Sequence, residues 1–203
     1  MTEQELVRAA QRGNEGAFEE LALRYEKQMY RLALRMCGRE EDAWEIYQEA
    51  LLAAWRGLGR FRGESALSTW LYRLTSNAAI DYLRRQNRQR GLEAVSLDDE
   101  EAFVPTADPA PSPQRSAELS ELRDQLQAGL LSLGEEQRQV LLLRELQGLS
   151  YEEISRALEL DLGTVKSRIA RGREKLRRFL LDSGNFSEFL PSNRQKASRE
   201  LTP

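Results

Sequence analysis

The stretch SYEEISRALELDLGTVKSRIARGREKLRR, residues 150–178, decides the fold of the C-terminal half of the chain. Ser150 and Glu153 have the spacing of a capping box, in which the serine oxygen accepts the Glu153 amide hydrogen and the glutamate reaches back. A turn follows, and Asp161 can cap the next helix. The apolar residues of that helix repeat at 3–4 spacing and predict one buried stripe. They are Leu162, Val165, Ile169, Gly172 and Leu176.

The opposite face of the same helix is rich in basic and hydroxyl side chains. It carries Thr164, Lys166, Ser167, Arg168, Arg171, Lys175 and Arg178, with Glu174 as the acidic exception. The major groove of DNA admits one helix, and such side chains can donate to base edges or neutralise phosphates. We therefore interpret this stretch as a DNA-binding helix-turn-helix. A solvated basic face on an ordinary bundle helix is the alternative.

The N-terminal part, to about residue 91, also has helical periodicity. Apolar residues at 3–4 spacing predict a first helix before Gly13 and a second that ends near Gly38. Two more are predicted over residues 41–56 and 67–85, separated by a glycine-rich loop. The sequence therefore predicts an all-helical N-terminal domain.

Aromatic residues and arginines alternate through the loop and the last of these helices. Rings can stack on unpaired bases while guanidinium groups hold phosphates, a combination suited to single-stranded nucleic acid. The candidates are Phe61, Arg62, Trp70, Arg73, Asn77, Arg84 and Arg85. A core position is favoured for Trp70 and for Tyr82. For Phe61, Arg62 and Asn77, which could read a base edge through its amide, binding and structural roles stay open.

The helix predicted over residues 41–56 has a different character. Asp42, Glu45 and Glu49 are acidic, and Gln48 and Trp55 flank them. An acidic face with an exposed aromatic residue suits a basic protein partner. A solvated helix face is the alternative.

Residues 92–117 change composition. An acidic run at residues 98–101 precedes four of the six prolines in the chain, Pro105, Pro109, Pro111 and Pro113. Proline lacks an amide hydrogen and restricts its neighbour, so we expect a linker between the two helical parts. The tail, residues 183–203, is mostly polar, and we expect disorder or weak docking there.

Composition excludes several classes of protein. The chain has 203 residues, 30 Lys and Arg against 33 Asp and Glu, no histidine and the single cysteine Cys37. Histidine-based metal sites, general bases and triads are thereby excluded, as is a disulfide framework within one chain. We expect no metal, no cofactor and no enzymatic activity. The acidic start and the lack of an apolar run of about 20 residues lead us to expect a cytoplasmic protein without membrane insertion.

Two groups of motifs together resemble a bacterial sigma factor of the extracytoplasmic-function type, within the sigma-70 family. The first is Asp42-Ala43, Gln48-Glu49-Ala50, Ala54-Trp55-Arg56, Phe61-Arg62-Gly63 and Thr69-Trp70-Leu71. The second is Gln137-Arg138, residues 140–144, Gly148-Leu149-Ser150-Tyr151-Glu152-Glu153-Ile154 and residues 163–168. The resemblance covers roughly Ala17 to Arg178.

The resemblance implies two small helical domains joined by a flexible linker. Residues 1–91 would be sigma region 2, which binds the clamp of core RNA polymerase and recognises and melts the −10 element. Residues 118–182 would be region 4, a helix-turn-helix that reads the duplex −35 element and docks on the polymerase flap. The linker would be residues 92–117 and the tail 183–203. An anti-sigma factor is a further partner that the resemblance implies.

Motif position also suggests roles for single residues. Core polymerase binding falls to Asp42, Gln48, Glu49 and Trp55. The −10 contacts fall to Phe61, Arg62, Trp70, Arg73, Asn77, Arg84 and Arg85, with Asn77 at the position that captures a flipped base. The −35 contacts fall to Arg144, Thr164, Lys166, Ser167, Arg168, Arg171 and Lys175. Trp44 and Tyr47 depart from the family pattern. A stand-alone helix-turn-helix regulator is the competing hypothesis.

Overall fold

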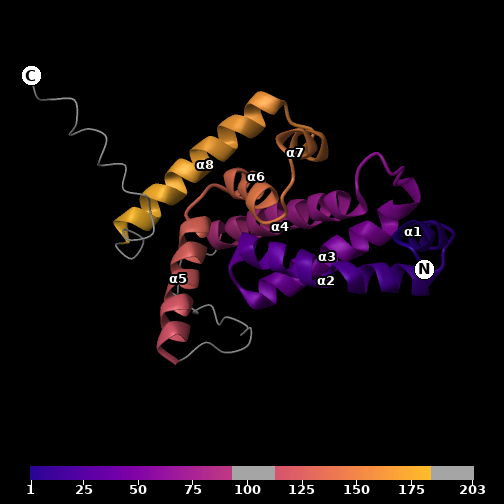
Figure 1. The fold of residues 1–203 in the computed structure, drawn as a ribbon, viewed down its shortest axis with the longest axis horizontal. Helices are drawn as coiled ribbons and strands as arrows, with labels where there is room; N and C mark the ends of the chain where they lie inside the picture. Colours follow the sequence, from indigo (N-terminus) through magenta and orange to yellow (C-terminus); the bar gives the residue numbers. More distant parts are fainter. Residues whose placement is uncertain (93–112, 184–203) are drawn as a thin grey trace, which may run out of the picture.

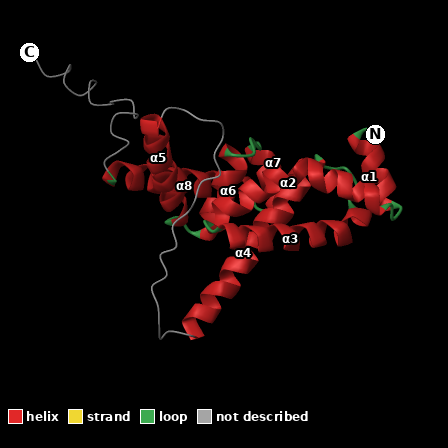
Figure 2. Ribbon diagram, turned by 90° about the horizontal axis from the view of Figure 1, so that it is seen from below, coloured by secondary structure: helices red, strands yellow, loops and turns green. Residues whose placement is uncertain are grey.

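The computed structural model describes residues 1–92 and 113–183, and within them all regular structure is helical (Figures 1 and 2). The predicted all-α fold class is confirmed. The N-terminal part contains α1 (Glu3–Gln11), α2 (Glu15–Cys37), α3 (Glu40–Gly57), the 3₁₀ turn η1 (Leu58–Arg60) and α4 (Leu67–Leu92). The C-terminal part contains α5 (Pro113–Leu131), α6 (Glu135–Glu145), α7 (Tyr151–Leu158) and α8 (Leu162–Asp182).

Local side-chain chemistry sets the helix ends. Asn14 caps α2 by accepting the Ala17 amide hydrogen at 3.0 Å. Gly38 ends the same helix with φ of 85°, a left-handed conformation that favours glycine. A Cβ atom at this position would lie 2.7 Å from the side chain of Leu131 on α5, so Gly38 also lets the two parts of the chain approach. The Ser150–Glu153 capping box is present at the start of α7, as predicted.

In the N-terminal part, α2, α3 and α4 pack against one another and α1 lies against α2 (Figure 1). The predicted fourth helix was expected to end near Arg85, whereas α4 continues to Leu92. No glycine or proline interrupts residues 85–90, so nothing in the sequence stops the helix there.

In the C-terminal part, α8 packs on α5, α6 and α7. Val165, Ile169 and Gly172 are buried, which confirms the predicted stripe of α8. Helix α5 begins at Pro113, so its first residues lie within the stretch 92–117 that was expected to be linker. Proline suits the first turn of a helix because its missing amide hydrogen has no helical partner there.

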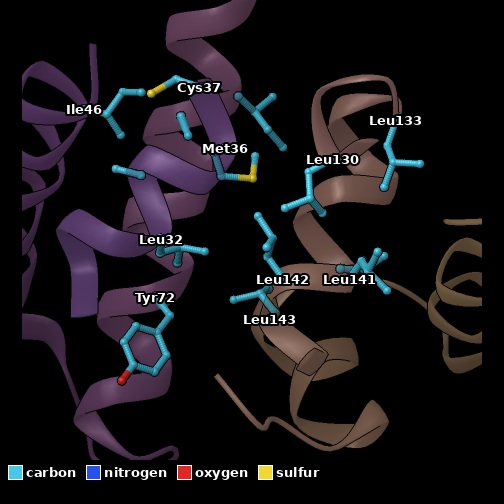
Figure 3. Close-up of a cluster of buried hydrophobic side chains, with 14 of the residues drawn as sticks. Leu32, Met36, Cys37, Ile46, Tyr72, Leu130, Leu133, Leu141, Leu142 and Leu143 are labelled. Atoms are coloured by element: carbon cyan, nitrogen blue, oxygen red, sulfur yellow. The ribbon is translucent and has the colours of Figure 1, made fainter. Parts of the chain in front are cut away.

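The two parts also pack on each other, because α2 contacts α5 and α6 while α4 contacts α6 and α7. One cluster of buried side chains runs across the boundary. In Figure 3, Leu32 and Met36 of α2 face Leu130 of α5 and Leu142 of α6. The expectations for the acidic run, the prolines at 105–111 and the tail after Ser183 fall outside the described residues.

Within the described ranges, no helix has both the length and the apolar character that crossing a bilayer requires.

Candidate nucleic-acid interface

An aromatic pair lies where the loop after α3 meets the start of α4. The rings of Phe61 and Trp70 are 5.2 Å apart with an interplanar angle of 41°. Gln11 of α1 fixes this loop, since its Nε2 atom donates to the carbonyl oxygens of Leu58 at 3.1 Å and Phe61 at 2.8 Å. Phe61 and Trp70 are partly buried, so each ring can pack against the core and still offer its exposed part for binding.

An open groove of about 970 Å³ lies beside this pair. Its lining residues include Arg60, Phe61, Arg62, Trp70 and Arg73 from the N-terminal part and Arg156 from α7. The structure thus brings four of the predicted single-strand contacts together on one surface. Arg73 lies 3.9 Å from Glu159, a distance that joins the guanidinium Nη1 and the carboxylate Oε1. Aromatic rings beside guanidinium groups can hold an unpaired strand by stacking and charge.

Asn77 lies further along α4 and is exposed, yet it has a partner. Its Oδ1 atom accepts a hydrogen bond from Nε2 of Gln139 at 2.9 Å. The same Gln139 nitrogen donates to Oγ of the buried Ser76 at 3.0 Å. The predicted base-capturing side chain is therefore hydrogen-bonded to α6 of the C-terminal part.

The two arginines near the end of α4 point to different neighbours. Arg85 pairs with Glu49 of α3 at 2.5 Å, and this hydrogen bond raises the pKa of Arg85. Its guanidinium also lies 5.8 Å from the Tyr82 ring centroid. Arg84 faces Glu135 and Glu136 of α6 at 3.6 and 3.4 Å. Of these two arginines, only Arg84 therefore contacts α6, as Asn77 does.

On α3, the four residues suggested for polymerase binding are in different environments. The Asp42 carboxylate accepts a hydrogen bond from the Tyr82 hydroxyl at 2.7 Å, and burial together with this bond raises the pKa of Tyr82 to about 12. Glu49 holds Arg85. Gln48 is exposed, and Trp55 is 38% exposed with its edge against Phe18. Two of the four side chains are therefore open to a partner and two also support the packing of α3 on α4.

In the sequence, Trp44 stands out only as a departure from the sigma-factor pattern. It is 44% exposed and stacks on Tyr30 of α2 with ring centroids 4.5 Å apart. Tyr47, the other departure, is buried and meets Trp44 edge-on at 5.7 Å. Trp44 and Tyr47 thus belong to one aromatic cluster with Tyr30. The Trp44 ring remains partly exposed on α3, one helical turn from Gln48.

The second candidate surface is α8. Asp161 accepts the Thr164 amide hydrogen at 2.7 Å, and the hydrogen bonds from Thr164 lower the Asp161 pKa. Ser167 donates to the Thr164 carbonyl at 3.0 Å. Arg171 is exposed and, within the described residues, has no ion-pair partner. Arg168 pairs with Glu136 of α6 at 2.5 Å.

Two of the predicted duplex contacts, Lys166 and Arg144, lie apart from that group, whereas Lys175 lies about 40° from Arg171 around the α8 axis. Helical geometry places Lys166 about 140° around the axis from Arg171. Lys175 donates to the carbonyl of Ser132 after α5. Arg144 donates to the carbonyl of Leu149 at 2.8 Å and lies 5.1 Å from the Tyr151 ring centroid. Arg144 thus braces the turn that leads into α7.

Sequence reasoning missed the role of α6. Arg138 is buried, and its guanidinium donates to the carbonyls of Leu130 at 2.9 Å, Leu131 at 2.9 Å and Leu133 at 3.0 Å. It also donates to the Met36 carbonyl at the end of α2. Burial lowers the pKa of Arg138. Its only sign in the sequence was its place in the Gln137-Arg138 motif.

Comparisons with known proteins identify the family of both parts of the chain. Residues 21–89 match the family model described as Sigma-70 region 2, and residues 123–176 match that described as Sigma-70, region 4. The RNA polymerase sigma-H factor of Pseudomonas aeruginosa is 39% identical over 178 residues, which cover 86% of this chain and 91% of the relative. The ECF RNA polymerase sigma-E factor of Escherichia coli strain K12 is 38% identical, covering 87% of this chain and 93% of the relative.

Solved structures share the fold. The sigma factor RpoE in complex with the anti-sigma factor NepR from Bartonella quintana has a TM-score of 0.64 at 22% identity, covering 80% of this chain and 96% of that one. CnrH in complex with the cytosolic domain of CnrY has a TM-score of 0.63 at 26% identity, covering 90% of this chain and 98% of that one.

Proposed function

Because the chain belongs to the sigma-70 family, as a sigma factor of the extracytoplasmic-function type, we propose that its two candidate surfaces divide the work of promoter recognition. The protein is an alternative sigma factor that works with core RNA polymerase and promoter DNA in transcription initiation. The hypothesis of a stand-alone regulator is set aside, since both sigma regions are present in order and the relatives are RNA polymerase sigma factors.

The −10 element is assigned to the N-terminal surface. The groove beside Phe61 and Trp70, with Arg62 and Arg73 at its wall, takes the unpaired strand. Asn77 receives one base that has left the stack. Unstacking and flipping a base costs a few kcal/mol, which contacts in a protein pocket can offset.

The −35 element is assigned to α8. Arg171 is exposed, and Thr164, Ser167 and Arg168 are half-buried. We assign these four side chains to the major groove and the exposed Lys166 and Lys175 to phosphates. Arg144 acts through the turn that it holds, because its guanidinium is bonded to the Leu149 carbonyl.

The clamp of core polymerase is assigned to α3. Gln48 and Trp55 make direct contacts, because their side chains are open to a partner. Asp42 and Glu49 add charge to this face while they hold Tyr82 and Arg85 in place. The flap is assigned to the C-terminal part.

The remaining assignments follow from the family. We divide the chain into region 2 at residues 1–91, a linker at 92–117, region 4 at 118–182 and a tail at 183–203. An anti-sigma factor is the expected inhibitor, which the complexes of the similar structures support. The chain itself catalyses no reaction and supplies specificity to the polymerase, in the compartment where that enzyme transcribes, the cytoplasm.

The observation that carries the proposal is the order of the two matches, with an arginine-lined aromatic groove in the first and a basic-faced helix-turn-helix in the second. A net charge of −3 predicts weak DNA binding by the free chain, since phosphate neutralisation dominates non-specific affinity. Transcription in vitro by core enzyme on a promoter library tests it. Selective transcripts that require the chain support the proposal, and identical transcripts with and without it contradict the proposal.

A further inference from the structure

One side chain of α1 reaches the loop that lines the proposed −10 groove. Gln11 is the last residue of α1, and its Nε2 atom donates to the carbonyl oxygens of Leu58 at 3.1 Å and Phe61 at 2.8 Å. These carbonyls lie at the two ends of η1, which closes through a bond from the Phe61 amide to the Leu58 carbonyl at 3.0 Å. Helix α1, which lies beside this turn in Figure 1, therefore holds both ends of it.

The chemistry of the glutamine side chain suits this position. An amide NH₂ group has two N–H donors, so one nitrogen atom can serve two carbonyl oxygens at once. An oxygen atom in the same place has no proton for either of them. A side chain of similar length without an N–H donor, such as methionine, would leave both carbonyls without this bond.

The bond to Phe61 controls where the loop goes next. The Phe61 carbonyl belongs to the peptide unit that joins Phe61 to Arg62, and both side chains line the groove. Because a peptide unit is planar, holding its oxygen also sets the direction in which the chain continues to Arg62. Gly63 follows with φ of 75°, and a Cβ atom there would meet no atom within 4 Å. Close packing therefore does not hold the loop at that point.

Gln11 is well placed to support the loop from outside. Within residues 1–92 and 113–183, no other side chain from beyond residues 58–66 hydrogen-bonds to the backbone of that segment. The support itself is firm, because Leu6, Ala9 and Ala10 bury α1 against the domain core. The turn after α1 is closed as well, since the Asn14 amide donates to the Ala9 carbonyl at 3.1 Å.

We propose that Gln11 is a positioning residue for −10 recognition, acting through the loop rather than on the bases. Its two hydrogen bonds hold the peptide between Phe61 and Arg62 so that the ring and the guanidinium group line the groove before DNA arrives. The unpaired strand then does not have to order the loop as it binds. This inference rests on the proposed function, which assigns the groove to the −10 strand.

The test separates base recognition from phosphate binding in the holoenzyme. One probe is a forked promoter selected from the library, with a duplex −35 element and an unpaired −10 strand. The second probe carries abasic sites in place of the −10 bases and keeps the phosphates. The ratio of the two dissociation constants measures the contribution of the bases. Gln11→Met is the test variant, and Gln4→Met is the matched control, because it makes the same change at another exposed position of α1.

We expect Gln11→Met to lower this ratio by about threefold to tenfold, because two hydrogen bonds to the loop are lost. Its affinity for the abasic probe should stay within about twofold of the wild type, since phosphate contacts depend mainly on charge. A chain that is merely less stable would contain less active protein, which affects both probes equally and cancels in the ratio. Circular dichroism checks that each variant keeps its helix content.

A ratio that Gln11→Met leaves unchanged, or that Gln4→Met lowers as much, would overturn the inference. The proposed function fails by a different result, in which the wild-type holoenzyme itself binds both probes equally. A wild-type chain that distinguishes the probes, with a Gln11→Met chain that distinguishes them equally well, would refute the positioning role alone and leave the −10 assignment standing.

Discussion

The Gln139 side chain donates a hydrogen bond to the Asn77 side chain at 2.9 Å, across 62 residues of sequence. Gln139 is buried on α6, whereas Asn77 is exposed on α4. An amide group of one domain thus holds the amide group that the other domain is proposed to offer to a base. Any measurement on Asn77 must therefore separate its bond to DNA from its bond to Gln139.

Asn77→Ala is expected to slow open-complex formation while duplex binding at the −35 element is retained. A lost hydrogen bond contributes about 1 kcal/mol, or about fivefold in the equilibrium between closed and open complexes. Permanganate footprinting with core enzyme measures the melted bases. Comparison in a Gln139→Ala background removes the domain contact from both proteins. Equal losses in melting and in duplex binding would remove Asn77 from the base-capture role.

Arg171→Ala is expected to weaken binding to the −35 duplex by about 1–3 kcal/mol if its guanidinium contacts a base edge. The side chain is exposed and without an ion-pair partner in the described residues, so no internal bond competes with DNA. Arg173→Ala is the control, because Arg173 of the same helix is paired with Glu145. Footprints of the holoenzyme measure both. An unchanged −35 footprint for Arg171→Ala would show that α8 does not place Arg171 against a base of the −35 element.

Ser150→Ala is expected to destabilise the C-terminal domain by about 1 kcal/mol, since a capping residue is lost. Ser150 accepts the Glu153 amide hydrogen at 3.1 Å, and Glu153 accepts the Ser150 amide hydrogen at 2.7 Å. For a chain of this size the melting temperature should fall by about 2–4 °C. Ser65→Ala, in the exposed loop before α4, should leave the melting temperature unchanged. A similar fall for both variants would contradict a specific role of the cap.

Because the Cys37 thiol is buried, we expect the folded chain to lose stability in alkaline solution. Burial raises the pKa of its thiol from 9.0 to about 11. The unfolded thiol ionises first as the pH rises, so this contribution is complete below pH 9.0 and is lost between there and about pH 11. Urea unfolding between pH 8 and 10 measures it, before most tyrosines ionise. Cys37→Ala should flatten that part of the profile, and an unchanged slope would show that other groups cause it.

Local patterns were enough to predict the helical character of both parts and several helix ends, though not the end of α4 or the start of α5. The capping box at Ser150 and the stripe at Val165 and Ile169 depend only on residues a few positions apart, and both are present. Gly38 was correctly predicted to end a helix, because a glycine adopts the left-handed backbone conformation of a helix C-terminus without a steric penalty. The family motifs, which are also local in sequence, led to the correct family.

The contacts between the two domains could not be predicted in this way. Gln139 and Glu136 look like ordinary polar residues of an amphipathic helix, and their partners on α4 are more than fifty residues away. Arg138 looks like a surface cation, yet it is buried because four backbone carbonyls converge on it. Such roles depend on how helices meet, which periodicity does not encode.

The most direct test of the central claim is the binding of purified chain to core RNA polymerase, measured by co-elution from a gel-filtration column at physiological salt. We expect a stoichiometric complex that protects a promoter from nuclease, while the chain without polymerase leaves the same promoter unprotected. A chain that elutes apart from the polymerase and protects a DNA target unaided would contradict the account.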